Sequence, residues 1–238
     1  MFRAVVQSIS DRLPSQCAVC GSWPRDPVCE ACVDRFAQPC ARCDTCAVPV
    51  HGGVNRCGAC IRDPPPLDAC VAAVHYAYPW AGLIVRFKFQ GQPGWASVLA
   101  AVLRNAPWVE PALDRADLVL PMPLARRRLR QRGFNQALQL AHHLAPLKTD
   151  PTLLLRTRDT PPQSALNRAD RLRNVRQAFA IAPGRGDTLA GRRVVLVDDV
   201  MTSGASLFAA AIAVRAARAD HVTALVLARA DLASDSAR

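Results

Sequence analysis

The sequence predicts an α/β fold in which a doubly wound, mostly parallel sheet follows a small cysteine-rich N-terminal module. Three observations support this prediction. Nine of the ten cysteines lie between Cys17 and Cys60. Beyond residue 67, short apolar runs alternate with helix-like stretches, which is typical of parallel sheets covered by helices on both faces. A length of 238 residues allows one domain of ordinary size and one small module.

Eight of the cysteines form four Cys-x-x-Cys knuckles. They are Cys17 with Cys20, Cys29 with Cys32, Cys43 with Cys46, and Cys57 with Cys60. Two such thiolate pairs complete a tetrahedral zinc site, so we expect one or two structural Zn²⁺ ions, with consecutive knuckles sharing a metal. A crossed arrangement, in which alternate knuckles share a metal, fits the spacing as well. Cys40 is a spare thiol that can compete with Cys43.

A disulfide framework is the alternative interpretation of these cysteines, and it requires an oxidising compartment. The N-terminal stretch, residues 1–14, has neither a long apolar run nor a small-residue cleavage site, so it does not predict a signal peptide. No run of 18 apolar residues predicts a membrane span. We therefore expect a cytoplasmic protein whose thiolates bind metal.

The expected domains are residues 1–62, a cysteine-rich zinc module, and residues 67–230, the α/β domain. The module has few large apolar side chains, so metal binding would supply much of its folding free energy. The segment RDPPP at 62–66 predicts a stiff linker. Residues 231–238 form a polar tail.

The first half of the larger domain predicts two strands and two helices. Residues 71–78, VAAVHYAY, form a mostly apolar run of strand length. Residues 83–89 and 95–106 carry apolar side chains at helical spacing. Residues 117–124, DLVLPMPL, predict a buried strand that prolines end.

The second half continues the alternation. Residues 135–145 predict a helix, and residues 192–199, RRVVLVDD, predict a buried strand that ends in two acids. Residues 204–219 predict a helix after a glycine, and residues 221–229 predict the last strand. Ligands of such sheets bind beyond the carboxyl ends of the strands.

The most informative site follows strand 192–199. Asp198 and Asp199 precede a loop in which free backbone N–H groups and the start of a helix can cradle a phosphate. Hydroxyls add donors, a glycine allows close approach, and the two carboxylates can accept hydrogen bonds from vicinal ribose hydroxyls. A helix N-cap after a core strand, the structural alternative, accounts for one hydroxyl and neither acid. The cradle residues are Val200, Met201, Thr202, Ser203, Gly204, Ala205 and Ser206.

The run VVLVDDVMTSGAS resembles the phosphoribosyl pyrophosphate motif of type I phosphoribosyltransferases, with Ser203 and Ser206 in place of two threonines. PMPLARRRLRQRGFNQ at 121–136, RADRLRN at 168–174 and FKF at 87–89 resemble the ComF/ComFC/GntX group, as do the cysteine knuckles. Those proteins join a zinc-ribbon-like segment to a type I phosphoribosyltransferase-like domain, and some act in natural transformation. The resemblance covers nearly the whole chain.

The resemblance implies a fold of the type I phosphoribosyltransferase kind and a site for phosphoribosyl pyrophosphate with Mg²⁺. Asp198 and Asp199 would contact the ribose, and the cradle would bind its 5′-phosphate. The turn after the strand at 117–122 would bind pyrophosphate through Leu124, Ala125 and Arg126. Segment 156–176 would close over the substrate with Gln163, Arg168 and Arg171 as ligands. Lys88 is a further phosphate candidate, and Arg132 and Asn135 are either ligands or positioning residues.

The net charge of +11 is concentrated in one stretch. Residues 116–176 hold twelve basic and four acidic side chains, a net of +8, whereas residues 1–70 hold seven of each. The arginines favour anionic ligands. One hypothesis is a phosphoribosyltransferase with an unknown acceptor, favoured by the intact acids. The alternative is a non-catalytic module that handles single-stranded DNA or senses the metabolite beside DNA-uptake proteins, favoured by the zinc module and the basic stretch.

Overall fold

The computed structural model describes residues 15–23, 26–157 and 178–230, and the chain divides into two compact units, Met1–Gln38 and Pro39–Arg238. The smaller unit contains the first two knuckles and helix α2 (Glu30–Phe36). The larger unit contains the other two knuckles together with the sheet. The expected domain boundary at residues 62–67 stays a prediction.

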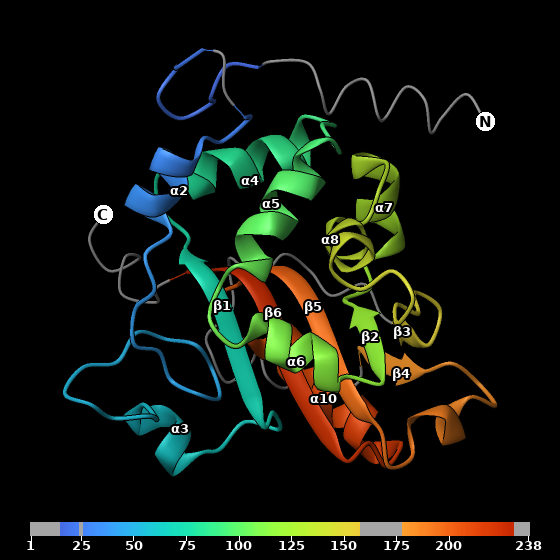
Figure 1. Ribbon diagram of the computed structural model, residues 1–238. Coiled ribbons are helices and arrows are strands. Elements are labelled where there is room, and N and C mark those ends of the chain that lie inside the picture. The colour runs from blue at the N-terminus through green and yellow to red at the C-terminus, as the bar shows by residue number, and fades with distance from the viewer. Residues whose placement is uncertain (1–14, 24–25, 158–177, 231–238) are drawn as a thin grey trace. The chain divides into compact units, whose positions relative to one another are not determined.

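A four-stranded parallel sheet forms the centre of the larger unit (Figure 1). Its strand order is β1 (Ala69–His75), β6 (His221–Arg229), β5 (Arg193–Met201) and β2 (Leu118–Pro121). All three neighbouring pairs are parallel. Every residue of β6 after His221 is buried, as expected for a central strand with apolar side chains on both faces. The predicted parallel sheet is confirmed.

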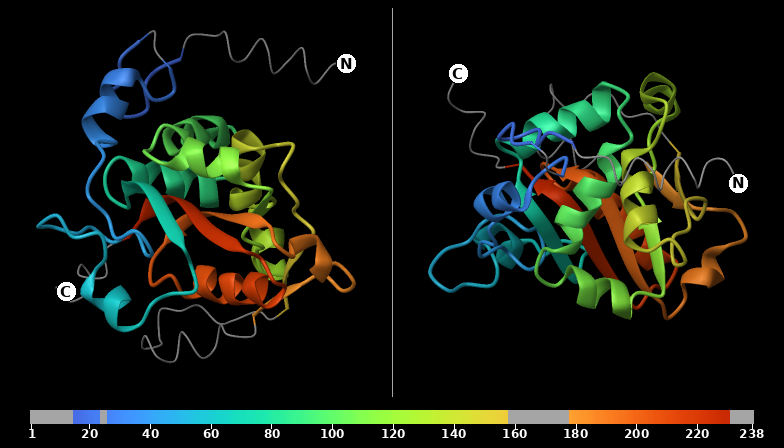
Figure 2. Two further views of the ribbon diagram at one scale, coloured as in Figure 1. Left: turned by 60° about the horizontal axis from the view of Figure 1, so that its bottom comes forward. Right: turned by 45° about the horizontal axis from the view of Figure 1, so that its top comes forward.

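Helices cover both faces of this sheet, so the doubly wound arrangement is confirmed as well. Figure 2 shows α5 (Trp95–Arg104) and α8 (Gln136–Leu144) on one side of the sheet and α10 (Ala205–Ala216) on the other. The apolar spacing explains why each helix packs. In α10, Leu207, Ala211 and Val214 recur at helical spacing, and each is at most 1% exposed. Helix α4 (Trp80–Phe89) precedes α5.

Several short elements were not predicted from the sequence. Helix α7 (Arg126–Arg132) has no buried residue, so it lacks the apolar periodicity that marks a helix. It ends at Gly133, whose φ of 80° is the left-handed conformation common after helices. The others are α3 (Gly58–Arg62), α6 (Val109–Arg115), the antiparallel pair of β3 (Leu154–Arg156) with β4 (Phe179–Ile181), and the 3₁₀ turn η2 (Gly186–Leu189).

Strand β5 is longer than the sequence predicted. The sequence placed its end at Asp199, but the strand continues to Met201 and pairs Val200 with Ala228 and Met201 with Arg229. The neighbouring β6 is equally long, so the ladder extends past the two acids. Val200 and Met201 are therefore strand residues. The part of the predicted cradle that follows the strand, residues 202–206, is called the phosphate loop below.

Across the described ranges, every helix is too short or too polar to span a membrane.

Candidate functional site

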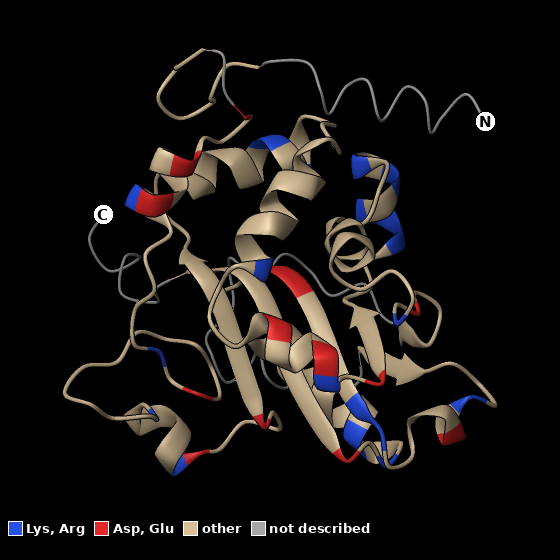
Figure 3. Ribbon diagram, in the orientation of Figure 1, with Lys and Arg blue, Asp and Glu red and all other residues tan. Residues whose placement is uncertain are grey.

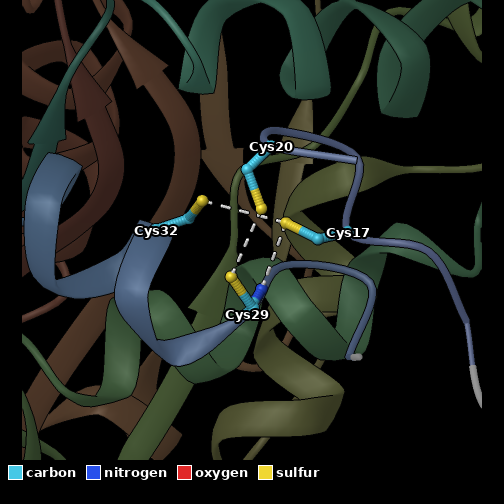
Figure 4. Close-up of side chains that lie close together, drawn as sticks. All are labelled: Cys17, Cys20, Cys29 and Cys32. Carbon is cyan, nitrogen blue, oxygen red and sulfur yellow. Dashed lines mark hydrogen bonds between the residues drawn. The ribbon is translucent and has the colours of Figure 1, made fainter. Parts of the chain in front are cut away.

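Four sulfur atoms converge in the smaller unit, from Cys17, Cys20, Cys29 and Cys32 (Figure 4). All four lie within 4.8 Å of one another. The Sγ atoms of Cys17 and Cys32 are 3.8 Å apart, and those of Cys20 and Cys29 are 3.7 Å apart. A tetrahedral zinc ion with Zn–S bonds of about 2.3 Å separates its sulfurs by about 3.8 Å. This first quartet can therefore hold zinc.

The second quartet lies in the larger unit and consists of Cys43, Cys46, Cys57 and Cys60. Its sulfurs also lie within 4.8 Å of one another, with 3.7 Å between Cys46 and Cys57. Consecutive knuckles thus share each cluster, and the crossed arrangement is excluded. All ten cysteines are free, and these sulfur separations are far longer than a disulfide bond of about 2.05 Å.

The two quartets are built from the same local structure. In each, the turn of the first knuckle is closed by a backbone hydrogen bond from a residue with positive φ: Gly21 donates to Cys17 (2.9 Å) and Ala47 donates to Cys43 (2.8 Å). The second knuckle of each begins a helix, because Cys29 is the N-cap of α2 and Cys57 the N-cap of α3. One turn–helix unit therefore occurs twice.

Each quartet contains one thiol that ionises near neutral pH. Burial alone would raise the pKa of Cys17, but hydrogen bonds from the backbone of Cys20 and Cys29 lower this pKa to about 6. Burial would also raise the pKa of Cys43, but hydrogen bonds from the backbone of Cys57 and from Thr45 lower this pKa to about 6. Burial and the neighbouring thiols raise the pKa of Cys32 to about 12. One preformed thiolate per cluster favours capture of a cation.

We expect the purified protein to contain about two zinc ions per chain, each bound by four thiolates. Elemental analysis of protein prepared without chelator measures this directly. Cys60→Ser should lower the content by about one ion, whereas Cys40→Ser, outside both quartets, should leave it unchanged. Metal-free protein with oxidised cysteines would contradict the prediction.

The second quartet is continuous with the core of the sheet. Cys43, Cys46 and Cys60 belong to the same buried cluster as Leu196 of β5 and Val226 of β6. The chain is also tied to the sheet edge there, because the backbone N–H of Cys70 in β1 donates to the Asp44 carbonyl at 2.6 Å. Cys70 is 4% exposed and packs as a small apolar residue of the core.

A pocket lies beyond the carboxyl ends of β2 and β5. Its charged lining comes from four separate elements: Lys88 of α4, Arg128 and Arg132 of α7, Arg156 of β3, and Asp198 and Asp199 of β5. Arg128 and Arg132 reach the same place because residues four apart share one face of a helix. We call this lining the anion pocket, because four cations face two acids.

The two acids differ in their surroundings. Lys88 Nζ lies 2.9 Å from Asp199 Oδ1, and both side chains are mostly buried. The backbone N–H of Asp199 donates to Asp198 Oδ1 at 2.9 Å. Burial, and then the charge of Asp199, raise the pKa of Asp198 to about 7. Near neutral pH the Asp198 carboxyl is thus partly protonated, which makes the net charge of the pocket more positive.

The raised pKa predicts a pH-dependent stability. A carboxyl whose folded pKa exceeds its unfolded value of about 3.9 binds its proton more tightly in the native state. This site therefore stabilises the fold at low pH, and the contribution is lost as the pH rises from about 4 through about 7. Asp198→Asn should melt above the parent at pH 8, because it removes a buried charge that Asp199 repels. Each kcal/mol gained in the free energy of unfolding should raise the melting temperature by about 2–4 °C.

Asp150→Asn is the matched control for this melting experiment. Arg185 Nη2 lies 2.6 Å from Asp150 Oδ2, and its hydrogen bond, acting against burial, lowers the pKa of Asp150. That carboxylate stabilises the fold above its unfolded pKa, so its variant should melt below the parent at pH 8. Equal shifts of one sign in both variants would contradict the assignment.

Two residues of the RGFNQ motif hold the pocket wall together. Asn135 is the N-cap of α8: its side chain accepts from the Leu138 N–H (3.3 Å) and donates to the Met122 carbonyl (3.0 Å). Arg132 donates to Gln136 Oε1 (2.9 Å), and its guanidinium lies 4.8 Å from the Phe89 ring centroid. Hydrogen bonds thus hold both side chains in place, and both of them line the pocket.

The phosphate loop adjoins this pocket, which Thr202 and Ser206 also line. Ser203 Oγ accepts from the Ala205 N–H at 3.4 Å, at the start of α10. The structure gives another reason for Gly204 than close approach of a ligand. Its φ is +80°, and a Cβ there would lie 2.5 Å from Met201 Cε and 2.7 Å from Phe208 Cζ. The left-handed backbone conformation therefore favours glycine here, and a larger residue would also displace the ends of the Met201 and Phe208 side chains.

The pyrophosphate turn is only partly as expected. Leu124 lines the pocket, but Ala125 is the N-cap of α7 and Arg126 is exposed, and neither is among the lining residues. Arg128 and Arg132 of α7 line the pocket, and the sequence had already offered Arg132 as a candidate ligand. Gln163, Arg168 and Arg171 lie outside the described residues.

Curated relatives resemble most of this chain. It is 34% identical over 173 residues to Competence protein F of Haemophilus influenzae, which covers 69% of this chain and 74% of the relative. It is 30% identical over 211 residues to DNA utilization protein YhgH of Escherichia coli K12, covering 82% and 88%. It is 27% identical over 215 residues to Competence protein ComFC of Bacillus subtilis, covering 87% and 85%. No family model matches the chain.

A solved structure of the allosteric regulatory enzyme of purine biosynthesis aligns with 56% of this chain, with a TM-score of 0.37 and 19% identity. The aligned part covers 25% of the length of that enzyme.

Proposed function

The chain belongs to the ComF/ComFC family, and from this premise we propose that it binds phosphoribosyl pyrophosphate with Mg²⁺ and acts as a phosphoribosyltransferase-like protein in DNA uptake. One observation carries the proposal. Thr202 and Ser206 of the phosphate loop, the acids Asp198 and Asp199, and a group of arginines line a single pocket at the carboxyl ends of parallel strands.

The chemistry of these groups suits the three parts of the ligand. Phosphoribosyl pyrophosphate carries a phosphate at one end, a diphosphate at the other, and two vicinal hydroxyls between them. Thr202 and Ser206 offer hydroxyl donors to the 5′-phosphate, and the carboxylates accept from the ribose diol. Arg128 and Arg132 offer positive charge to the diphosphate.

The proposed chemistry breaks the bond between the anomeric carbon and the pyrophosphate oxygen. Pyrophosphate leaves with the bonding electrons, and an acceptor or water forms the new bond to that carbon. Mg²⁺, when bound, would neutralise charge on the pyrophosphate oxygens. The residues of this chain hold the two ends of the ligand apart and stabilise the leaving group through the arginines.

Calorimetry of the full chain with Mg²⁺ tests this function. Phosphoribosyl pyrophosphate should bind at least about tenfold more tightly than ribose 5-phosphate or pyrophosphate alone, because only the complete ligand reaches both ends of the pocket. Chelation of Mg²⁺ should remove that advantage. Equal affinity for all three compounds, or no binding, would refute the proposal.

Single-stranded DNA is the second candidate ligand. Arg126, Arg127 and Arg130 are exposed on α7, and Figure 3 shows basic residues along this helix. The name of one relative, DNA utilization protein YhgH, refers to DNA. Exposed arginines bind phosphate backbones without sequence preference.

The salt dependence of DNA affinity tests the second candidate. If the three exposed arginines each neutralise one phosphate, replacing all of them with glutamine should flatten the slope of log affinity against log salt by about 2. Arg128 and Arg132 stay in place, so binding of phosphoribosyl pyrophosphate should persist. An unchanged slope would remove α7 as a DNA contact.

A further inference from the structure

Arg229, the last residue of β6, is buried at 3% exposure and donates to four backbone carbonyls. Its Nε donates to Cys46 at 2.9 Å. Its Nη1 donates to Met201 at 3.1 Å, and to Thr202 and Ala230 at 2.5 Å each. One guanidinium thus connects the second quartet, the end of β5 and the phosphate loop.

A cation buried in this way needs a specific reason. Removing a charged group from water costs several kcal/mol unless partners satisfy it. Within the described residues, no carboxylate lies within ion-pair distance of Arg229, and its hydrogen-bond partners there are backbone carbonyls. Lysine lacks the planar fork of donors that reaches several carbonyls at once.

The contacts of Arg229 fall on the part of the chain that a ligand would use. Met201 pairs with Arg229 across the ladder, and Thr202, the next residue, begins the phosphate loop and lines the anion pocket. Holding both carbonyls fixes the direction in which the backbone leaves the strand. The N–H groups that follow are then preorganised before ligand arrives.

The hydrogen bond to the Cys46 carbonyl connects Arg229 to the second quartet. Cys46 is a member of the second quartet, and metal binding there fixes the position of its backbone. We propose that Arg229 is a positioning residue that holds the phosphate loop in its binding geometry and makes this geometry depend on metal in the second quartet. The inference rests on the proposed function, because the loop must bind the phosphate of the ligand.

The first test replaces Arg229. Arg229→Lys keeps the charge but loses the fork, so affinity for phosphoribosyl pyrophosphate with Mg²⁺ should fall about tenfold or more in calorimetry. Hydrogen exchange of the amides at 202–206 should become faster. Arg215→Lys is the matched control: Arg215 also donates to a backbone carbonyl, that of Asp220 (2.9 Å), but does not line the pocket. It should leave both measurements unchanged.

The second test leaves Arg229 intact and removes one metal at a time. Cys60→Ser disables the second quartet, and Cys32→Ser disables the first. We expect the Cys60 variant to lose affinity and loop protection, and the Cys32 variant to keep both. When Cys60→Ser is combined with Arg229→Lys, the loss should be smaller than the product of the two single losses, because both changes break one connection.

The outcomes separate this inference from the proposed function. If the parent does not bind phosphoribosyl pyrophosphate, the proposed function fails. If the parent binds and Arg229→Lys binds equally well, the positioning role is overturned. If Cys32→Ser and Cys60→Ser have equal effects, or if the two losses multiply in the combined variant, the link between metal and loop is overturned.

Discussion

Replacing both Asp198 and Asp199 with asparagine is expected to lower Mg²⁺-dependent affinity for phosphoribosyl pyrophosphate by at least about 100-fold. The amides keep the shape of the carboxylates but remove the charge that attracts the diol and the metal–pyrophosphate group. The variant should remain folded. Loss of the Asp198 charge removes repulsion, which offsets the loss of the Asp199 ion pair with Lys88.

Calorimetry measures this affinity, and thermal melting verifies the fold. Asp150→Asn is the matched control, since Asp150 is also partly buried and ion-paired but does not line the pocket. Its ligand affinity should equal that of the parent. If the double variant binds as tightly as the parent, the phosphoribosyl site lies elsewhere.

Lys88→Met should destabilise the fold by about 3–5 kcal/mol, because it leaves the buried Asp199 carboxylate without its partner. The expected fall in melting temperature is about 2–4 °C per kcal/mol. Adding Asp199→Asn should restore part of the stability by removing the unpaired charge.

Denaturant unfolding measures the effect of Lys88→Met. Lys148→Met is the control, because Lys148 Nζ donates to the Leu113 and Asp114 carbonyls at 2.8 and 3.0 Å rather than to a carboxylate. The loss of stability in Lys148→Met should be smaller. Equal losses in both variants would mean that the Lys88–Asp199 pair contributes no specific stability.

The sheet was predictable because its signal is local. The apolar run of β6 was placed at residues 221–229, where the strand lies, and the acid pair with the loop after it is contiguous in the chain. The end of β5 was not predictable, since its extension to Met201 depends on pairing with the distant residues Ala228 and Arg229. Local pattern says little about such ladders.

The rest of the pocket depends on tertiary structure. Lys88, Arg132 and Arg156 come from three elements, and only the fold brings them to the two acids. Helix α7 could not be predicted from the sequence, because all its side chains remain at least partly exposed. Its run of arginines therefore has the pattern of a solvent-exposed segment. Arg229 carries no local signal at all: it follows eight mostly apolar residues as an ordinary strand end.

The knuckles were recognisable from spacing, but their packing was not. Few large apolar side chains occur between Cys17 and Cys60, so a weak core was expected there. The cysteines themselves supply buried surface instead, and Cys43 is fully buried. Pattern-based reasoning treats such residues as ligands and overlooks their volume.

The two quartets therefore differ in how freely related sequences can change them. The first belongs to a compact unit of its own, so a relative could lose those knuckles and keep the interior of the sheet. The second contributes Cys43, Cys46 and Cys60 to that interior. A lineage that gave up this metal would have to refill the space with apolar side chains of similar volume. Substitution at the second quartet is thus constrained by packing as well as by coordination.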